Sequence, residues 1–131
     1  MTTRNLRPLQ RTIGAFAVLP VLSGLGEALL GPRAVPGGSP AVLPTVDSAF
    51  RYANTFKVAA GLTLWTELGR VDRSPATTTV LATVAVGGAV RLLSWRQHGR
   101  PHPAIVAATV GETVLVPIII AWRRRLQNSP T

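Results

Sequence analysis

The chain has 131 residues, of which 47% are hydrophobic and only 15% charged, with a net charge of +9 and no cysteine. Soluble domains carry about 25% charged residues, so this sequence lacks the polar side chains that coat a water-exposed surface. The missing cysteine excludes disulfides, thiol catalysis and thiolate metal sites. The basic residues separate long apolar stretches and accompany no recognition motif, which argues against a nucleic-acid-binding protein. The length allows a single domain, residues 1–131.

Four segments are apolar over about 20 residues, the length that crosses the hydrocarbon core of a bilayer. The second is the weakest, because Lys57 and Glu67 interrupt it. The first is better read as a retained helix than as a cleaved signal peptide, because Glu27 interrupts it and no small-residue cleavage site follows. We therefore expect an all-α bundle of four transmembrane helices with antiparallel neighbours. The expected spans are roughly 12–31, 52–69, 76–95 and 103–122.

The placement of arginine predicts the orientation of these spans. Three arginines precede the first span, and Arg123–Arg125 follow the fourth as a stop-transfer run. Basic residues next to membrane spans favour the cytoplasmic side, so we expect both termini in the cytoplasm and the protein in the cytoplasmic (inner) membrane. The cytoplasmic set would be Arg4, Arg7, Arg11, Arg70, Arg73, Arg123, Arg124 and Arg125. Aromatic residues at the span ends agree with this arrangement; they are Tyr52, Trp65, Trp95 and Trp122.

Two connections differ in character. The outer segment 32–51 contains four prolines and Gly37-Gly38, so we expect an irregular loop between the first two helices. Within it, Asp47 or Ser48 is expected to cap the second helix. The inner connection 70–75 is short, which predicts that the second and third helices are antiparallel neighbours.

Ionisable residues within the spans are the most informative feature, because one charge near the bilayer centre costs about 2.5–3.5 kcal/mol. They are Glu27, Lys57, Arg91 and Glu112. Each shares its helical face with small residues, which let membrane helices approach closely. We therefore expect these charges to point into the outer half of the bundle and to converge there. The candidate polar or ligand-binding cluster is Glu27, Asp47, Arg51, Lys57, Arg91 and Glu112.

Two interpretations of this cluster remain open. The charges can form ion pairs that set the register of the helices, or they can line a pocket for a small polar ligand, a lipid headgroup or a proton. Pro20 and Pro117 lie inside the first and fourth spans, where each should kink its helix. Pro117 also deprives the Thr113 carbonyl of its partner, next to Glu112.

No other pattern points to a chemical site. His98 and His102 are four residues apart, but Gly99 and nearby prolines deny them a helix and no third ligand is evident, so we predict no metal site. Glu67 and Asp72 are expected to pair with Arg70 and Arg73 near the inner face, each pair contributing little. No catalytic triad, phosphate-binding loop or dinucleotide motif is present, so we predict no catalytic residues and no cofactor.

Several short motifs are distributed along the chain. They are Ser23-Gly24-Leu25-Gly26-Glu27, Pro44-Thr45-Val46-Asp47-Ser48 with Phe50-Arg51-Tyr52, Gly61-Leu62, Gly87 through Trp95, Gly99 through Pro103, and Glu112 through Pro117. Together they resemble a family of small bacterial four-helix membrane proteins described only as a domain of unknown function. The likeness covers nearly the whole chain and implies the four-helix fold without naming a reaction. In layout the chain is also similar to DoxX-like four-helix membrane proteins, some of which accompany redox enzymes; without cysteine, any thiol-redox role would belong to a partner.

Three functions remain to be weighed. We expect a non-enzymatic accessory or scaffold component of the membrane, surrounded by lipids and associated with another membrane protein or with a second copy of itself. The alternative is a small carrier or ligand-binding protein whose polar site lies in the outer half of the bundle. An enzyme acting on a lipid or quinone comes third, because nothing supplies a nucleophile or a metal.

Overall fold

The computed structural model describes residues 3–128, and side chains from residue 6 onward, so the side chain of Arg4 lies outside the described part. Its described residues form helices joined by turns and one irregular loop, with no strand, which confirms the all-α prediction. In chain order the elements are α1 (Thr3–Phe16), α2 (Val18–Leu30), the 3₁₀ turn η1 (Gly31–Ala34), α3 (Pro44–Thr66), the 3₁₀ turn η2 (Leu68–Arg70), α4 (Pro75–His98), α5 (Pro103–Val110), the π-helical segment η3 (Gly111–Leu115) and α6 (Val116–Gln127).

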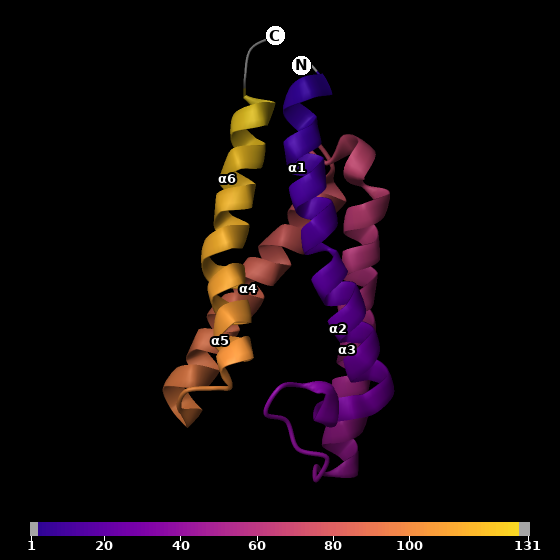
Figure 1. Ribbon diagram of the computed structural model, residues 1–131, viewed down its shortest axis with the longest axis vertical. Helices are drawn as coiled ribbons and strands as arrows, with labels where there is room; N and C mark the ends of the chain where they lie inside the picture. The colour runs from indigo at the N-terminus through magenta and orange to yellow at the C-terminus, as the bar shows by residue number, and fades with distance from the viewer. Residues whose placement is uncertain (1–2, 129–131) are drawn as a thin grey trace.

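The chain runs along the long axis of the molecule four times (Figure 1). α1 and α2 lead away from the end that holds both termini, α3 returns, α4 leads away again, and α5, η3 and α6 return. We call the end with the chain termini the terminal end, and the opposite end, which holds the loop 35–43 and the α4–α5 turn, the loop end. The short turn between the second and third rods is confirmed. An irregular loop does join the first two rods, but it covers only residues 35–43 of the predicted segment 32–51, because α3 already begins at Pro44.

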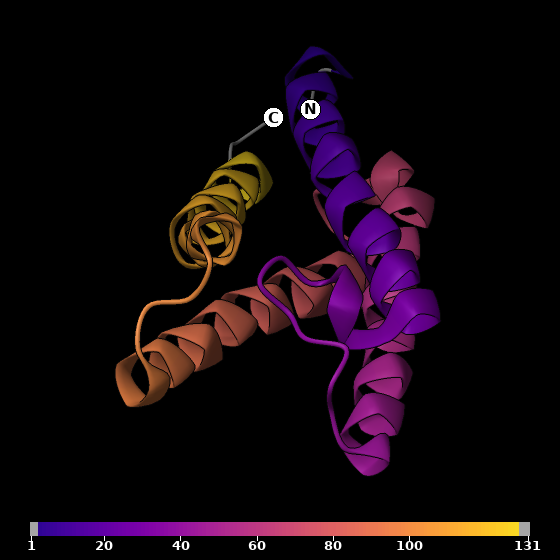
Figure 2. The same ribbon diagram turned by 60° about the horizontal axis from the view of Figure 1, so that its bottom comes forward.

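The rods are arranged as two packed halves that form a V. α2 lies along α3 in one half, and α4 lies along α5, η3 and α6 in the other. The halves meet at the terminal end and diverge toward the loop end (Figures 1 and 2). No Cα atom of α2 lies within 8 Å of one in α4, η3 or α6, all of which the structure describes completely. The antiparallel neighbours α3 and α4 therefore separate beyond their shared turn.

The apolar core lies where the halves meet. α1 contacts α3, η2 and α6 there, and its buried residues point toward them. The fully buried core residues are Leu9, Ile13, Ala17, Leu64, Val71, Leu81, Val116 and Ile119. Large apolar side chains elsewhere are exposed, including Leu19 at 67% and Leu29 at 73%. A water-soluble protein rarely leaves so much contiguous apolar surface uncovered, whereas lipid-facing helices do so as a rule.

Three helical stretches are long and apolar enough to cross a membrane. They are Leu6–Ala34, Pro75–His98 and Pro103–Gln127. α3 is long enough but falls short in hydropathy, because Lys57, Asn54 and several threonines lie within it. This is the segment that the sequence marked as the weakest of the four.

Helix boundaries differ from the prediction at α3, which begins at Pro44, eight residues before the expected start. Proline suits the first position of a helix because the N–H it lacks has no intrahelical partner there. The predicted cap is wrong: Leu43 occupies the N-cap position and makes no side-chain bond. Asp47 instead lies in the first turn, where a negative charge favours the helix dipole.

Both predicted helix interruptions are confirmed. The first rod breaks at Ala17, between α1 and α2, three residues before Pro20. The last rod breaks at η3, where the N–H of Val116 bonds to the carbonyl of Gly111, five residues back. Pro117 follows at once, and because it lacks an N–H the regular α-helical ladder cannot pass through it. A π segment is how the helix accommodates this defect, and such segments are frequent at functional sites.

Candidate functional site: ion pairs between neighbouring helices

The first ion pair joins the two helices of one half. Nζ of Lys57 on α3 donates to Oε1 of Glu27 on α2 at 2.9 Å. Glycines let these helices approach closely: a Cβ on Gly24 would lie 2.9 Å from Val58, and one on Gly61 would lie 2.6 Å from Val21. Small residues therefore do set the helix spacing here, and that spacing places the lysine opposite the carboxylate.

The second pair, Asp47 with Arg51, closes the end of α2. Nε of Arg51 donates to Oδ2 of Asp47 at 2.7 Å, and its Nη1 donates to the carbonyls of Leu29 at 2.6 Å and Ala28 at 3.2 Å. These carbonyls belong to the last turn of α2 and have no partner within the helix. Arg51 is thus a cap supplied by α3, and Asp47 holds it in place.

Gly31 makes this cap fit. Its φ of 72° is a left-handed conformation that glycine adopts without strain. A Cβ there would lie 2.6 Å from Oδ1 of Asp47 and 2.7 Å from Nη2 of Arg51. The chain can therefore turn out of α2 directly beneath the arginine only because this residue has no side chain.

The third pair lies in the other half. Nε of Arg91 on α4 lies 2.9 Å from Oε2 of Glu112 in η3. That carboxylate oxygen is inaccessible and has no aligned hydrogen bond in the described structure, so the contact is an ion pair without the favourable N–H···O geometry. A Cβ on Gly88 would lie 2.8 Å from both Cβ of Glu112 and Cγ2 of Thr113, which shows how closely α4 approaches the π segment.

The six predicted residues therefore form three separate acid–base pairs. Each base contacts an acid of its own half, and within residues 6–128 no hydrogen bond or ion pair connects Arg91 or Glu112 with the four residues on α2 and α3. The pairing of opposite charges agrees with the sequence interpretation, but the structure supports no common chamber. A single ligand site that uses all six residues stays a prediction without a geometric basis.

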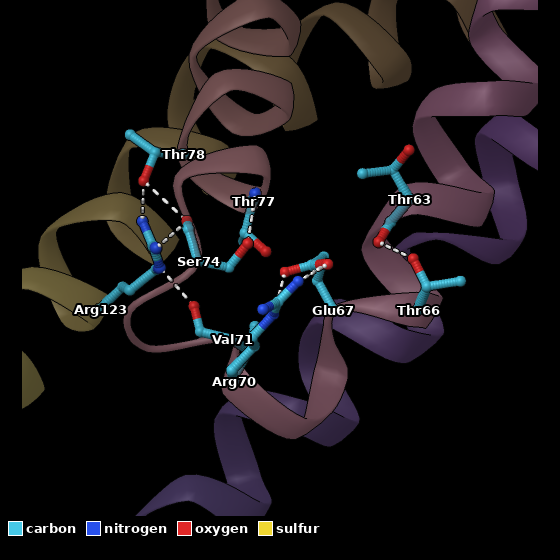
Figure 3. Close-up of polar contacts among 9 residues, drawn as sticks. All are labelled: Thr63, Thr66, Glu67, Arg70, Val71, Ser74, Thr77, Thr78 and Arg123. Carbon is cyan, nitrogen blue, oxygen red and sulfur yellow. Dashed lines mark hydrogen bonds and ion pairs between the residues drawn. The ribbon is translucent and has the colours of Figure 1, made fainter.

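A second polar cluster at the terminal end was not predicted (Figure 3). Arg123 on α6 is only 4% exposed. Its guanidinium donates to the carbonyls of Val71 at 2.5 Å and Ser74 at 2.6 Å, and to the hydroxyl of Thr78 at 2.6 Å. These groups belong to the α3–α4 turn and the start of α4, so one side chain fastens the last helix to the turn that joins the two halves.

The sequence placed Arg123 in a basic run after the fourth span and did not distinguish it from its two neighbours. In the structure Arg124 and Arg125 are exposed, whereas Arg123 is buried. Arg123 follows Val116 and Ile119 at intervals of seven and four, and both of those residues are buried. Residues at this spacing share a helical face. The spacing was the signal that could have identified the buried arginine.

Glu67 and Arg70 lie beside this cluster and form the pair that the sequence predicted. Nε and Nη2 of Arg70 donate to the two carboxylate oxygens of Glu67 at 2.7 and 2.8 Å. Hydrogen bonds from Arg70 and then Ser74 lower the pKa of Glu67, which follows the last residue of α3, to about 2. Ser74 also caps α4 by accepting the N–H of Thr77. The carboxylate therefore stays ionised at any ordinary pH.

The remaining features include shallow hollows and two histidines. An open hollow of about 340 Å³ is lined by Leu92, Trp95 and Arg96, near the end of α4. His102 accepts the N–H of Ala104 through Nδ1 and so caps α5, and Nδ1 of His98 lies 3.3 Å from the Ser94 carbonyl. A second open hollow, of about 650 Å³, is lined by Pro44, Thr45, Ser48, Ala49 and Tyr52.

The fold and these sites define an all-helical protein with helices of membrane-spanning length and apolarity. Residues 8–123 match the family described as a domain of unknown function, DUF4345, and the chain belongs to that family. This confirms the family type that the sequence motifs suggested, whereas the bacterial and DoxX-like parts of that resemblance stay predictions. No curated protein and no solved structure matches the chain significantly.

Proposed function

We propose that this protein is a non-enzymatic accessory component of the cytoplasmic membrane, a rigid helical scaffold that crosses the bilayer four times and associates with another membrane protein or a second copy. The observation that carries the proposal is the pairing of each intramembrane acid with a base of its own half. Buried pairs of this kind fix which helices pack together and in which register. Such a pattern serves a structural role without requiring a ligand.

The geometry of α3 supports the fourth crossing. Its 23 residues extend about 34 Å, enough for a hydrocarbon core of about 30 Å. The helices that precede and follow it, α2 and α4, each belong to a stretch that is apolar enough to span a membrane. α3 runs along the long axis from the loop end, where the first of these stretches finishes, to the terminal end, where α4 begins (Figure 1). The ion pair with Glu27 offsets the cost of Lys57, the charge that makes α3 unfavourable as a span by itself.

The absence of cysteine makes the topology directly testable. Single cysteines at Ser39 in the loop, at Arg73 in the α3–α4 turn and at Asn128 near the C-terminus can be labelled in intact cells with a membrane-impermeant maleimide. Four crossings with cytoplasmic termini predict labelling at Ser39 alone. If α3 did not cross, Ser39 and Arg73 would be on the same side and would react alike.

The accessory role is tested by isolation of the full chain from its native membrane in a mild detergent. We expect it to copurify with one defined membrane protein, or with a second copy of itself, at fixed stoichiometry. Lone monomers at every detergent concentration would contradict the proposal.

A ligand-binding or carrier function is the second candidate, and one observation favours it. Arg91 and Glu112 are paired less completely than the other intramembrane charges, and they lie at a π segment. If this function holds, Arg91 and Glu112 replaced together by glutamine should leave a folded protein that no longer binds its ligand. A double variant that binds normally would exclude this site.

A further inference from the structure

The basic side chains within the helices differ in how fully their donors are used. Arg51 donates to a carboxylate and two carbonyls, and Arg123 donates to two carbonyls and a hydroxyl. Lys57 donates to Glu27. Nε of Arg91 lies 2.9 Å from Oε2 of Glu112, and in the described part of the chain neither Nη1 nor Nη2 donates a hydrogen bond. Four N–H groups of this guanidinium therefore remain available on a helix that is apolar enough to span a membrane.

The position of Arg91 leaves these donors accessible. Its side chain is 37% exposed, compared with 21% for Glu112. It lies seven residues, or about 10 Å, before the end of α4 at His98. Unsatisfied donors in an apolar medium each cost free energy, so this guanidinium favours an external acceptor.

The surroundings of Arg91 combine positive charge with apolar surface. Trp95 lies four residues further along α4 and shares its face, and the open hollow beside it is lined by Leu92, Trp95 and the exposed Arg96. Val90 on the adjoining surface is 60% exposed. Tryptophan at the end of a span is typical of the headgroup level of a bilayer. A molecule with an anionic head and an apolar tail matches both parts of this surface.

We infer that Arg91, with Trp95 and Arg96 beside it, binds the anionic head of a membrane amphiphile, a phosphate or carboxylate on an apolar chain. The two Nη groups form a fork that matches two oxygens of such a head. Glu112 holds the guanidinium through Nε and competes with the ligand for its charge. This inference deepens the second candidate function and is independent of the accessory role, whose copurification test has a separate readout.

The competition by Glu112 gives the inference its sharpest consequence. Replacing Glu112 by glutamine removes the competing negative charge and leaves Arg91 in place, so the affinity for the anion should increase. One additional charge-assisted hydrogen bond from the freed guanidinium to the anion corresponds to an increase of roughly tenfold. A purely structural ion pair instead predicts that the natural protein shows no preference for the anionic head, because Glu112 already neutralises the arginine.

The test uses Trp95 as the reporter. The full chain is reconstituted in phosphatidylcholine nanodiscs, and its fluorescence is titrated with three brominated quenchers in separate arms: phosphatidylcholine, phosphatidylglycerol and a long-chain fatty acid at pH 8. The quenching measured for the Trp95→Phe variant is subtracted from that of the natural protein, which leaves the quenching of Trp95 itself. Preference for the phosphatidylglycerol or fatty-acid quencher over phosphatidylcholine supports the inference and identifies the source of the head.

Three variants distinguish a site from general electrostatic attraction. Glu112→Gln should increase the preference, and Arg91→Gln combined with Glu112→Gln should abolish it without leaving an unpaired charge. Arg100→Gln, which removes one exposed positive charge from the α4–α5 turn, should leave it unchanged. Equal quenching by the anionic and neutral probes overturns the inference. So does a preference that survives in the double variant, or one that Arg100→Gln reduces as much.

Discussion

The pair between Glu27 and Lys57 offers the most direct test of how this fold is held together. Lys57→Met keeps most of the length of the side chain but removes its charge. The carboxylate of Glu27, with 14% of its side chain exposed, then loses its partner at 2.9 Å. Glu27→Gln with Lys57→Met removes both charges at similar volume. The first substitution should destabilise the protein, and the second should largely restore it.

The magnitude follows from the environment of the pair. Breaking a buried pair by removing one partner costs about 3–5 kcal/mol, and one charge at the centre of a span costs about 2.5–3.5 kcal/mol. With 30% of the Lys57 side chain exposed, the lower end applies, so we expect about 3 kcal/mol for Lys57→Met. Replacement of both partners by neutral groups is often close to neutral, so the double variant should lie within about 1 kcal/mol of the natural protein.

The assay is reversible unfolding in mixed micelles with increasing dodecyl sulfate, followed by circular dichroism. Arg100→Gln serves as the matched control, because it also removes one positive charge but from an exposed position in the α4–α5 turn. Glu27→Gln alone, measured with the other two variants, completes a double-mutant cycle. If the two single substitutions were additive, or if Lys57→Met unfolded no more easily than Arg100→Gln, the pair would not stabilise the contact between α2 and α3.

Three further outcomes follow from particular contacts. Gly88→Ala should destabilise by about 1–3 kcal/mol in the same unfolding assay, because its Cβ would lie 2.8 Å from the π segment, whereas Gly87→Ala, with nothing within 4 Å, should be neutral or slightly stabilising. Arg123→Met should cost about 3 kcal/mol by stranding acceptors of the α3–α4 turn, whereas Arg124→Met should cost little; equal effects would contradict the buried anchor. Because the pKa of Glu67 is lowered to about 2, its contribution to stability is complete above the pKa of the unfolded state and is lost as pH falls toward 2. Glu67→Gln should therefore remove this part of the pH dependence of the free energy of unfolding. The same pH dependence in the variant and in the natural protein would contradict this reasoning.

Local chemistry explains what was correctly expected from the sequence. Proline lacks an N–H, which accounts for the helix breaks that were expected near Pro20 and Pro117. The proline- and glycine-rich segment between the first two rods could form no regular helix, and the short stretch 70–75 required α3 and α4 to meet. The start of α3 was placed too late, because proline at the first helical position is compatible with a helix as well as with a loop.

Which acid pairs with which base could not be predicted in this way, because the pairing depends on the spacing and angles between helices. The sequence indicated that charges would point inward and find opposite charges, but it did not indicate which acid would meet which base. Glu27 meets Lys57 because Gly24 and Gly61 let α2 and α3 approach along their length. Arg51 turned out to cap α2, since the carbonyls it contacts belong to a helix that is remote in sequence.

The sequence by itself determined the helical class, the apolar segments, the helix breaks and the inventory of charges within those segments, all of which follow from side-chain chemistry and residue spacing. Only the tertiary structure decided that the charges divide between two diverging halves, that Arg123 is buried at the turn between them, and that Arg91 keeps unused donors. The physical reason is that hydrogen bonds and ion pairs form over about 3 Å. Whether two groups come that close is decided by the packing of whole helices, which no short stretch of sequence encodes.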